Sequence, residues 1–466
     1  MSNYEGAESS ASRRVRRDLL CRRWAGRRLH FIAIGGAGMS ALALVCRGLG
    51  AEVGGSDRAD SSYLRRLRDA GIDARVGHDA ESVPDGADVV VSTAITDDNP
   101  ELVRARERGQ RVLHRGELLA AVCAERRLIA VAGTHGKTTT AGMLAHGLRS
   151  AGVDVPFLLG GELPAIGPGG EAANAGWGDS EWIVAEADES DGSFLCLRPE
   201  VAVITNVELD HHSRWRTRAE LTDAFRRFAE PATGVALNAD PDLDPLATNL
   251  KGNVPFRLER FDQSSPGPEL ALAVPGRHNL LNARAAIAAV ELAGLDVESF
   301  AAALAGFPGM KRRLELRGHL GGAAVYDDYA HHPTEVAAAL AALRDLEPRR
   351  LVAVFQPHLY SRTKALAREF GAALAAADVI GVLNVYPARE QPVGELEGVS
   401  GLQVAEAAAD RAGGRPVLWL REPETAVGVI AGLEPALGDG DVVVALGAGD
   451  VGERFAGPLV DAGAPA

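Results

Sequence analysis

Short apolar runs alternate with longer amphipathic stretches from Leu29 almost to the end of the chain. A short apolar run predicts a buried strand, whereas apolar residues recurring every three to four positions predict a helix. Strands are predicted at residues 30–34, 88–92, 128–132, 182–185, 201–205, 351–355, 379–383 and 442–446, and helices at 39–49 and 141–148. Strands that alternate with helices are typical of parallel sheets with crossover helices, so the pattern predicts an α/β protein.

The predicted elements fall into three blocks. The chain has 466 residues, more than one hydrophobic core usually organises. We predict a basic, flexible extension over residues 1–28, followed by domains over residues 29–125, 126–316 and 317–466. The glycine- and proline-rich residues 160–178 predict a surface loop inserted in the second block.

Composition narrows the classes of function. A net charge of -14 argues against a nucleic-acid binder, because phosphate backbones are held by a surplus of Lys and Arg. The four cysteines are scattered and form no CxxC pair, which favours a reducing compartment. No apolar run is long enough to span a membrane. These features together predict a cytoplasmic protein.

The strongest chemical signal follows the strand predicted at 128–132. The sequence GTHGKTT, residues 133–139, joins this strand to the next helix. Backbone N–H groups of a glycine turn and the positive end of a helix converge on one point, Lys137 adds a charge, and Thr138 offers a hydroxyl to magnesium. The loop therefore predicts a phosphate site. Its spacing departs from the full Walker pattern, because Gly133 lies three residues before Gly136, whereas that pattern places its first glycine five residues before the second.

Polar side chains follow two further strands of the second block. Residues 186–191 (EADESD) come after one strand, and residues 205–212 (TNVELDHH) end the other. The carboxyl ends of parallel strands gather ligands, and the phosphate loop lies at the same edge. A carboxylate there can hold magnesium against ATP. A solvated acidic turn explains residues 186–191 about equally well.

Asn279 and Asn282 lie three residues apart at the start of an alanine-rich helix. An amide side chain both donates and accepts hydrogen bonds, so it can cap a helix or hold a purine edge. Capping explains Asn279 but not easily both residues. The cations at 311–313, taken alone, indicate a solvated face.

Two other groups of residues suggest ligands. Residues 36–40 (GAGMS) follow a strand, with Asp57 about twenty residues later, which imitates a dinucleotide fingerprint. This motif leaves both NAD and a nucleotide-sugar diphosphate open. Residues 327–335 and 356–362 are polar clusters that suit the amine and the carboxylate of an amino acid. A helix N-cap at Thr334 is the structural alternative for part of the first cluster.

Taken in this order, the motifs resemble those of the Mur ligase family from about Leu29 to Gly452. The resemblance rests on residues 35–40, 133–138, 186–194, 205–206 with 210–211, 278–279 with 282, 327–335 and 355–362. It implies an N-terminal Rossmann-like domain, a central P-loop-type ATPase α/β sheet and a C-terminal Rossmann-like domain. These would bind the UDP part of a substrate, ATP and an amino acid, respectively.

The resemblance also implies roles for single residues. The implied catalytic residues are Lys137, Glu186 and His211, and the implied ligands of Mg²⁺, or of Mn²⁺ in its place, are Thr138, Glu186 and His211. The implied ATP contacts are Gly133, Thr134, His135, Gly136, Lys137, Thr138, Thr139, Asn279, Asn282 and Arg313. The implied UDP contacts are Gly36, Ala37, Gly38, Met39, Ser40 and Asp57, and the implied amino-acid contacts are Tyr329, His331, His358 and Arg362. Leu359 departs from a common arginine of the family, which affects the carboxylate clamp.

The implied reaction is ATP-dependent amide formation in peptidoglycan precursor synthesis. The carboxylate of UDP-N-acetylmuramate would attack the γ-phosphate of ATP, and the amine of L-alanine would attack the resulting acyl phosphate. The implied partners are these small molecules, with no nucleic acid and no membrane, and the implied state is a monomer or weak homodimer. Three alternatives stay open: a related recycling ligase that attaches a peptide, an NAD-dependent oxidoreductase using Gly36, Gly38 and Asp57, and a P-loop switch or motor.

Overall fold

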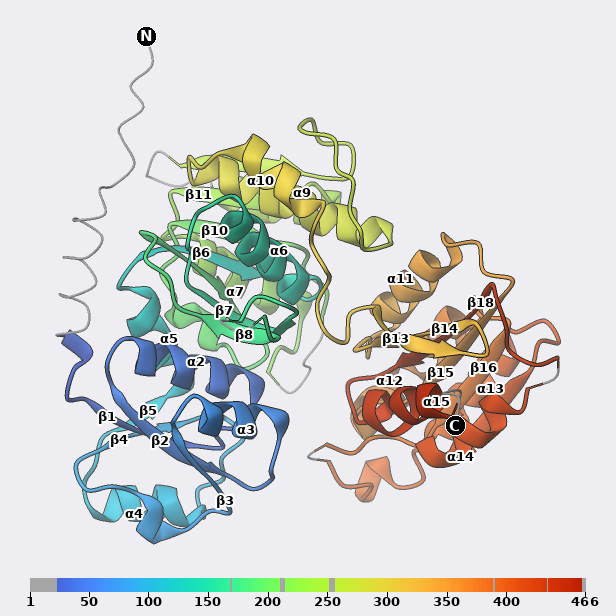
Figure 1. Cartoon of the computed structure of the whole chain (residues 1–466), viewed down its shortest axis with the longest axis horizontal. Coiled ribbons are helices and arrows are strands. Elements are labelled where there is room, and N and C mark those ends of the chain that lie inside the picture. The colour runs from blue at the N-terminus through green and yellow to red at the C-terminus, as the bar shows by residue number, and fades with distance from the viewer. Residues whose placement is uncertain are drawn as a thin grey trace. The chain divides into compact units, whose positions relative to one another are not determined.

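The structure is a computed structural model, and it describes residues 23–167, 170–209, 214–250, 256–388, 390–433 and 435–462. Three largely parallel sheets with helices between their strands follow one another along the chain (Figure 1). The predicted α/β class with three sheet domains is therefore confirmed. In the described residues, no helix is both long and apolar enough to cross a membrane.

The first sheet is fully parallel, in the order β3-β2-β1-β4-β5. Its strands are β1 (Arg28–Ile32), β2 (Glu52–Asp57), β3 (Asp73–Val76), β4 (Asp88–Val91) and β5 (Val112–His114). The helices of this part are α2 (Ala37–Gly48), α3 (Ser62–Asp69), α4 (Pro100–Glu107) and α5 (Arg115–Cys123). The order reverses on either side of β1, so the loop after β1 lies where ligands of such sheets usually bind.

The second sheet has the order β12-β11-β10-β6-β9-β7-β8 and is parallel except for the β7–β8 pair. Its strands are β6 (Arg127–Ala132), β7 (Phe157–Leu163), β8 (Ala173–Gly176), β9 (Trp182–Glu186), β10 (Val201–Ile204), β11 (Gly234–Asn238) and β12 (Arg257–Phe261). The helices are α6 (Lys137–Ser150), α7 (Arg218–Ala229), α8 (Asp244–Asn249), α9 (Arg277–Leu292) and α10 (Val297–Leu304). Strand β6 is buried at every position except its first, because it lies between β9 and β10.

The third sheet has the order β13-β14-β18-β15-β16-β17, with an antiparallel edge strand β13. Its strands are β13 (Glu315–Leu320), β14 (Ala323–Asp328), β15 (Arg350–Phe355), β16 (Val379–Leu383), β17 (Val417–Arg421) and β18 (Asp441–Leu446). The helices are α11 (Pro333–Arg344), α12 (Tyr360–Leu374), α13 (Gly401–Ala409), α14 (Pro423–Ala431) and α15 (Gly457–Asp461). Alternate residues of β15 enter two separate apolar clusters, one with α11 to α13 and one with α14 and α15, so both faces of this sheet are covered.

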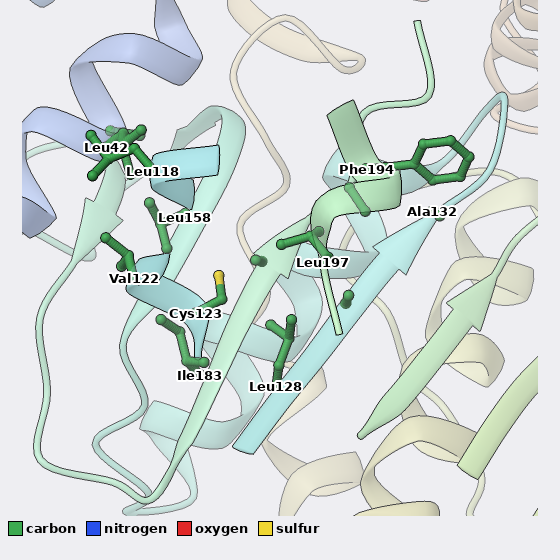
Figure 2. Close-up of a cluster of buried hydrophobic side chains, with 14 of the residues drawn as sticks. Leu42, Leu118, Val122, Cys123, Leu128, Ala132, Leu158, Ile183, Phe194 and Leu197 are labelled. Atoms are coloured by element: carbon green, nitrogen blue, oxygen red, sulfur yellow. The ribbon is translucent and has the colours of Figure 1, made fainter. Parts of the chain in front are cut away.

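The chain divides into two compact units, and the first two sheets belong to the same one. This unit comprises residues 1–271 and 281–307, and the other comprises residues 272–280 and 308–466. Figure 2 shows how the first unit is joined: Leu42 of α2 and Leu118 of α5 gather with Leu158 of β7 and Ile183 of β9 in one buried cluster. Shared apolar burial therefore fixes the first sheet against the second.

Two local predictions are wrong. Residues 160–178 include the end of β7 and all of β8, not only a surface loop, because their small residues are buried against α2. The helix after residue 331 begins at Pro333, and its N-cap is His332, whose Nδ1 accepts from the Thr334 backbone N–H. Proline is favoured at the first helical position, which places the cap before it and excludes Thr334.

Candidate functional site

The loop between β6 and α6 is held by the residues that follow β10. The Asn206 side chain accepts a hydrogen bond from the His135 backbone N–H at 2.9 Å and donates to the His135 carbonyl at 2.9 Å. The Thr205 hydroxyl donates to the same carbonyl at 2.6 Å. The Thr134 hydroxyl donates to the Glu208 carbonyl at 2.8 Å. These bonds hold Thr134 and His135 against the segment that follows β10.

Two glycines in this loop have backbones that other residues adopt only with strain. Gly133 has φ 139° and Gly136 has φ 80°, both in the region that disfavours a Cβ atom. A Cβ at Gly133 would collide with the Thr205 hydroxyl, and one at Gly136 would collide with the Asn282 side-chain oxygen. The loop is therefore closely packed by its own sheet and by α9.

Lys137 opens α6 and lies across this loop. Its ammonium donates to the carbonyls of Gly133 at 2.6 Å and Thr134 at 3.0 Å, and it forms an ion pair with Glu189 at 2.8 Å. Burial alone would lower the pKa of Lys137, but the carboxylates of Glu189, Asp188 and Glu186 raise it. The side chain is therefore a fixed positive charge at the helix start, where a phosphate group would be attracted.

Glu186, at the end of β9, lies beside the hydroxyl of Thr138. That hydroxyl donates to one carboxylate oxygen at 2.9 Å, and the backbone N–H of Gly160 donates to the other at 2.7 Å. A hydroxyl and a carboxylate at the carboxyl edge of a sheet are the oxygen ligands that magnesium takes in proteins. The donor set predicted from the sequence at these two residues fits a magnesium ion.

The acidic turn after β9 is more than a solvated turn, because most of it is paired. Burial alone would raise the pKa of Asp188, yet Lys137 and Arg115 hold it well below its usual range. Burial raises the pKa of Glu189 to about 7 against the opposing effect of Lys137. Asp188 and Asp191 both pair with Arg115, at 3.0 and 2.8 Å. The turn therefore carries a fixed pattern of charge next to the phosphate loop.

The loop after β1, residues 35–38, forms another glycine turn in the same unit. It is the first glycine turn along the chain, and the turn at residues 133–136 is the second. Asp57 closes it, because its carboxylate accepts from the backbone N–H groups of Gly35 at 2.9 Å and Ala59 at 3.2 Å. Met39 and Ser40 are buried, and the Ser40 hydroxyl donates to the Ala37 carbonyl at 3.0 Å. Gly36 and Gly38 are exposed at this turn and Ala37 is half-buried, and the UDP contacts of all five motif residues stay a prediction.

In the other unit, the four residues predicted to hold an amino acid lie together. His331 meets the ring of Tyr329 at 5.3 Å and that of His358 at 5.9 Å, both edge-on. Arg362, which is buried on α12, reaches within 3.4 Å of the His358 Nδ1. Tyr386 stacks on His358 at 5.9 Å with the rings 12° apart. The sequence analysis missed Tyr386, although it follows β16 at the same edge of the sheet.

The remaining predicted contacts have different outcomes. Asn282 lies against Gly136, as described above, whereas the Asn279 amide donates to the Pro275 carbonyl at 2.7 Å inside its own unit. Arg313 faces Glu335 at 3.8 Å and lies over the Tyr329 ring. Thr139 is buried in the first turn of α6. His211 lies outside the described residues, so its predicted metal role stays a prediction.

Sequence reasoning also missed Arg115 and Asn174. Arg115 is the first residue of α5, directly after β5, and its position at a strand end is the signal that was available. Asn174 lies on β8, in the stretch predicted to be a surface loop, and its amide donates to the Ala37 carbonyl at 2.7 Å. Both residues connect the first glycine turn to the second sheet.

Models of protein families match most of the chain. The model described as "Mur ligase family, catalytic domain" matches residues 28–127, "Mur ligase middle domain" matches 131–255, and "Mur ligase, glutamate ligase domain" matches 312–449. Among curated proteins, the UDP-N-acetylmuramate–L-alanine ligase of Renibacterium salmoninarum is 43% identical, over 94% of this chain and 97% of that protein. The ligase of the same name from Kineococcus radiotolerans is 46% identical, over 91% and 94%. A crystal structure of the UDP-N-acetylmuramate-alanine ligase from Thermotoga maritima is 28% identical, with a TM-score of 0.77, over 93% of this chain and 98% of that one.

Proposed function

The chain belongs to the Mur ligase family, and on that premise we propose that it joins L-alanine to the carboxylate of UDP-N-acetylmuramate with ATP as the energy source. The observation that carries the proposal is the arrangement of Lys137, Thr138 and Glu186 around one phosphate loop. A reaction of this kind needs a fixed cation and a metal-binding oxygen pair at the γ-phosphate. The named relatives supply the identity of the two substrates.

Charge and position supply most of the catalysis in this proposal. Lys137 holds the transferring phosphoryl group, because its ammonium already lies across the loop that receives the phosphates. Thr138 and Glu186 would hold Mg²⁺, which neutralises phosphate charge when it is bound. The substrate carboxylate attacks the γ-phosphate and ADP leaves, which gives an acyl phosphate, a better electrophile than the carboxylate. The amine of L-alanine then attacks the acyl carbon, loses a proton and displaces inorganic phosphate. No nucleophile of the enzyme is needed for either step.

The other unit would bind L-alanine, whose amine attacks the acyl phosphate. The cluster of Tyr329, His331, His358 and Arg362 brings a buried guanidinium next to two imidazoles and a phenol ring. A guanidinium suits the carboxylate of an amino acid, because its planar fork matches the two carboxylate oxygens. Leu359 offers no second cation, so Arg362 is the proposed carboxylate ligand.

Several further statements are part of the same proposal. We propose domain boundaries at residues 28, 125 and 316, and a state of monomer or weak homodimer, from the sequence. We place the reaction in the cytoplasm, because it consumes ATP and nucleotide-sugar precursors. Gly36, Ala37 and Gly38 are proposed to receive the UDP diphosphate, and Asn282 to lie close to the ATP site.

The test is release of phosphate from ATP by the full chain with Mg²⁺. We expect release to require both UDP-N-acetylmuramate and L-alanine, and a product mass that equals their sum minus water. Replacing L-alanine by a tripeptide tests the alternative ligase that attaches a peptide. A crystal structure of a murein peptide ligase from Psychrobacter arcticus is also similar, at 26% identity and a TM-score of 0.67 over 94% of this chain and 98% of that one. Release without either substrate would indicate a P-loop switch or motor, and a change in nicotinamide absorbance would indicate an oxidoreductase. Either result would contradict the proposal.

A further inference from the structure

Arg115 lies between the two glycine turns of the first unit. It begins α5, at the carboxyl end of β5 in the first sheet, yet its ion-pair partners belong to the acidic turn of the second sheet. Its Nε donates to Asp191 at 3.2 Å, and its Nη2 donates to Asp188 at 3.0 Å and to Asp191 at 2.8 Å. One edge of the guanidinium is therefore occupied by two carboxylates.

The remaining nitrogen, Nη1, faces the first glycine turn. A Cβ atom added to Gly38 would lie 3.1 Å from it. In the part of the chain that the structure describes, no residue accepts a hydrogen bond from this nitrogen, and about a quarter of the Arg115 side chain is exposed. An N–H group of a permanent cation is therefore directed toward the loop that opens α2.

The position of Arg115 is fixed from two sides. The first turn of α5 packs closely on residues 193–196, since a Cβ at Gly116 would lie 2.7 Å from the Ser193 Cβ. Asn174 of β8 braces the other side of the loop through the Ala37 carbonyl and the Ser40 hydroxyl, at 2.7 and 3.1 Å. The first glycine turn is thus bracketed by Arg115 on one side and by a residue of the second sheet on the other.

The carboxylates that pair with Arg115 also interact with a second cation. Burial would lower the pKa of Arg115, but Asp188 and Asp191 raise it, so the guanidinium stays charged. Asp188 is also stabilised as an anion by Lys137 of the phosphate loop. One carboxylate is therefore shared between the lysine of the second glycine turn and the arginine that faces the first.

We infer that Arg115 is a substrate-binding residue whose Nη1 contacts the diphosphate of the nucleotide-sugar at the first glycine turn, while its other edge ties that turn to the acidic turn beside Lys137. The inference rests on the proposed function, because it needs a nucleotide diphosphate as the ligand. The start of α2 would offer backbone N–H groups to the diphosphate, but residues 36–40 contain no cation. Arg115 supplies that cation.

The inference is tested with Arg115→Gln and Arg115→Lys in the full chain. Calorimetry would give the Kd of UDP-N-acetylmuramate, and competition would give those of UDP and uridine. Arg115→Gln removes one charge-assisted contact, so we expect the Kd values of UDP-N-acetylmuramate and of UDP to rise by about tenfold or more. The Kd of uridine is expected to change by less than about twofold, because uridine has no phosphate for the cation to contact. Arg115→Lys is expected to lie between the wild type and Arg115→Gln, since lysine keeps the charge but lacks the fork.

The matched control is Arg66→Gln. Arg66 of α3 pairs with Glu162 of β7, so this variant also removes an ion pair between the first and second sheets. Unlike Arg115, neither Arg66 nor Glu162 lies within 4 Å of a Cβ built at Gly36 or Gly38. It is expected to bind UDP-N-acetylmuramate as the wild type does. Equal loss in Arg66→Gln and Arg115→Gln, equal loss of uridine and UDP, or unchanged binding in Arg115→Gln would each overturn the inference. A wild-type chain that binds no UDP-N-acetylmuramate would instead overturn the proposed function.

Discussion

The two glycine turns of the first unit look alike in sequence but are built differently. The turn at residues 133–136 is held by its own sheet through Thr205 and Asn206, and its cation, Lys137, is the residue that follows it. The turn at residues 35–38 is closed by Asp57 of the same sheet. Its cation, Arg115, is close in space but belongs to α5, far along the chain. Its amide brace, Asn174, comes from the second sheet.

This difference shows what a glycine motif does and does not specify. Glycines permit close approach of a phosphate to the backbone, and both turns offer that. The cation decides how strongly the turn attracts charge. In the second turn the cation is encoded within the motif, whereas in the first it depends on the packing of two sheets. We therefore expect substitutions within the second turn to impair its function most. For the first turn, substitutions between the first and second sheets should matter most.

The largest effect is expected for Lys137→Ala. Removing the cation at the γ-phosphate position should lower kcat for phosphate release by about a thousandfold or more, because this charge acts on the transferring group. The melting temperature should also fall, because the buried carboxylate of Glu189 loses its partner. Turnover is therefore compared at a temperature at which circular dichroism shows that the variant is folded. The control is Lys364→Ala, a half-exposed lysine on α12 that should keep wild-type turnover. Turnover in Lys137→Ala within tenfold of the wild type would contradict the site assignment.

An intermediate effect is expected for Gly133→Ala. Its φ of 139° and the collision of the new Cβ with the Thr205 hydroxyl force the loop to move. A displacement near 1 Å typically costs about a hundredfold in rate, so kcat should fall by about that factor. The paired variant is Gly38→Ala in the first turn, where the new Cβ meets only the far end of Arg115. It should raise the KM for UDP-N-acetylmuramate a few-fold and leave kcat unchanged. Equal losses in the two variants would remove the distinction between the turns.

The smallest effect on turnover, but a clear one on stability, is expected for Glu101→Gln. Glu101 is fully buried, and it contacts His30 and the Ser56 hydroxyl at 2.8 Å each. Removing the charge from a buried carboxylate that accepts hydrogen bonds should lower the free energy of unfolding by about 3 kcal/mol. Urea unfolding followed by tryptophan fluorescence would measure it, with turnover at 25 °C within a few-fold of the wild type. A stability equal to the wild type would contradict this prediction.

The same glutamate predicts a dependence on pH. Burial would raise the pKa of Glu101, but hydrogen bonds from His30 and Ser56 outweigh it, so the folded pKa is below the ordinary value. Its contribution to stability is therefore present above about pH 4.3, the ordinary pKa of glutamate, and is lost as the pH falls through the lower folded value. The difference in stability between the wild type and Glu101→Gln should shrink on acidification below that pH. A difference that grows there would contradict the sign.

Many of the strands, and the second glycine turn, could be predicted from the sequence, because each depends on neighbouring residues. The apolar run at β6, the GKT sequence and the start of α6 follow one another within one short stretch, so their order alone places Lys137 at a helix start. The same holds for Glu186 at the end of β9, where strand direction fixes the edge that its side chain reaches.

What only the tertiary structure decided are the contacts between segments distant in the chain. Asn174 was predicted to lie in a surface loop, because glycine and small residues usually indicate turns, yet their small volume is what lets β8 approach α2 closely. Arg115 belongs to no motif, and its role depends on two carboxylates more than 70 residues away. The sequence by itself determined which side chains can bind phosphate or metal and placed them at strand ends and helix starts, because the order of neighbouring residues sets the direction of the backbone. Packing determined which of them meet, because burial of apolar surface between the sheets acts without regard to distance along the chain.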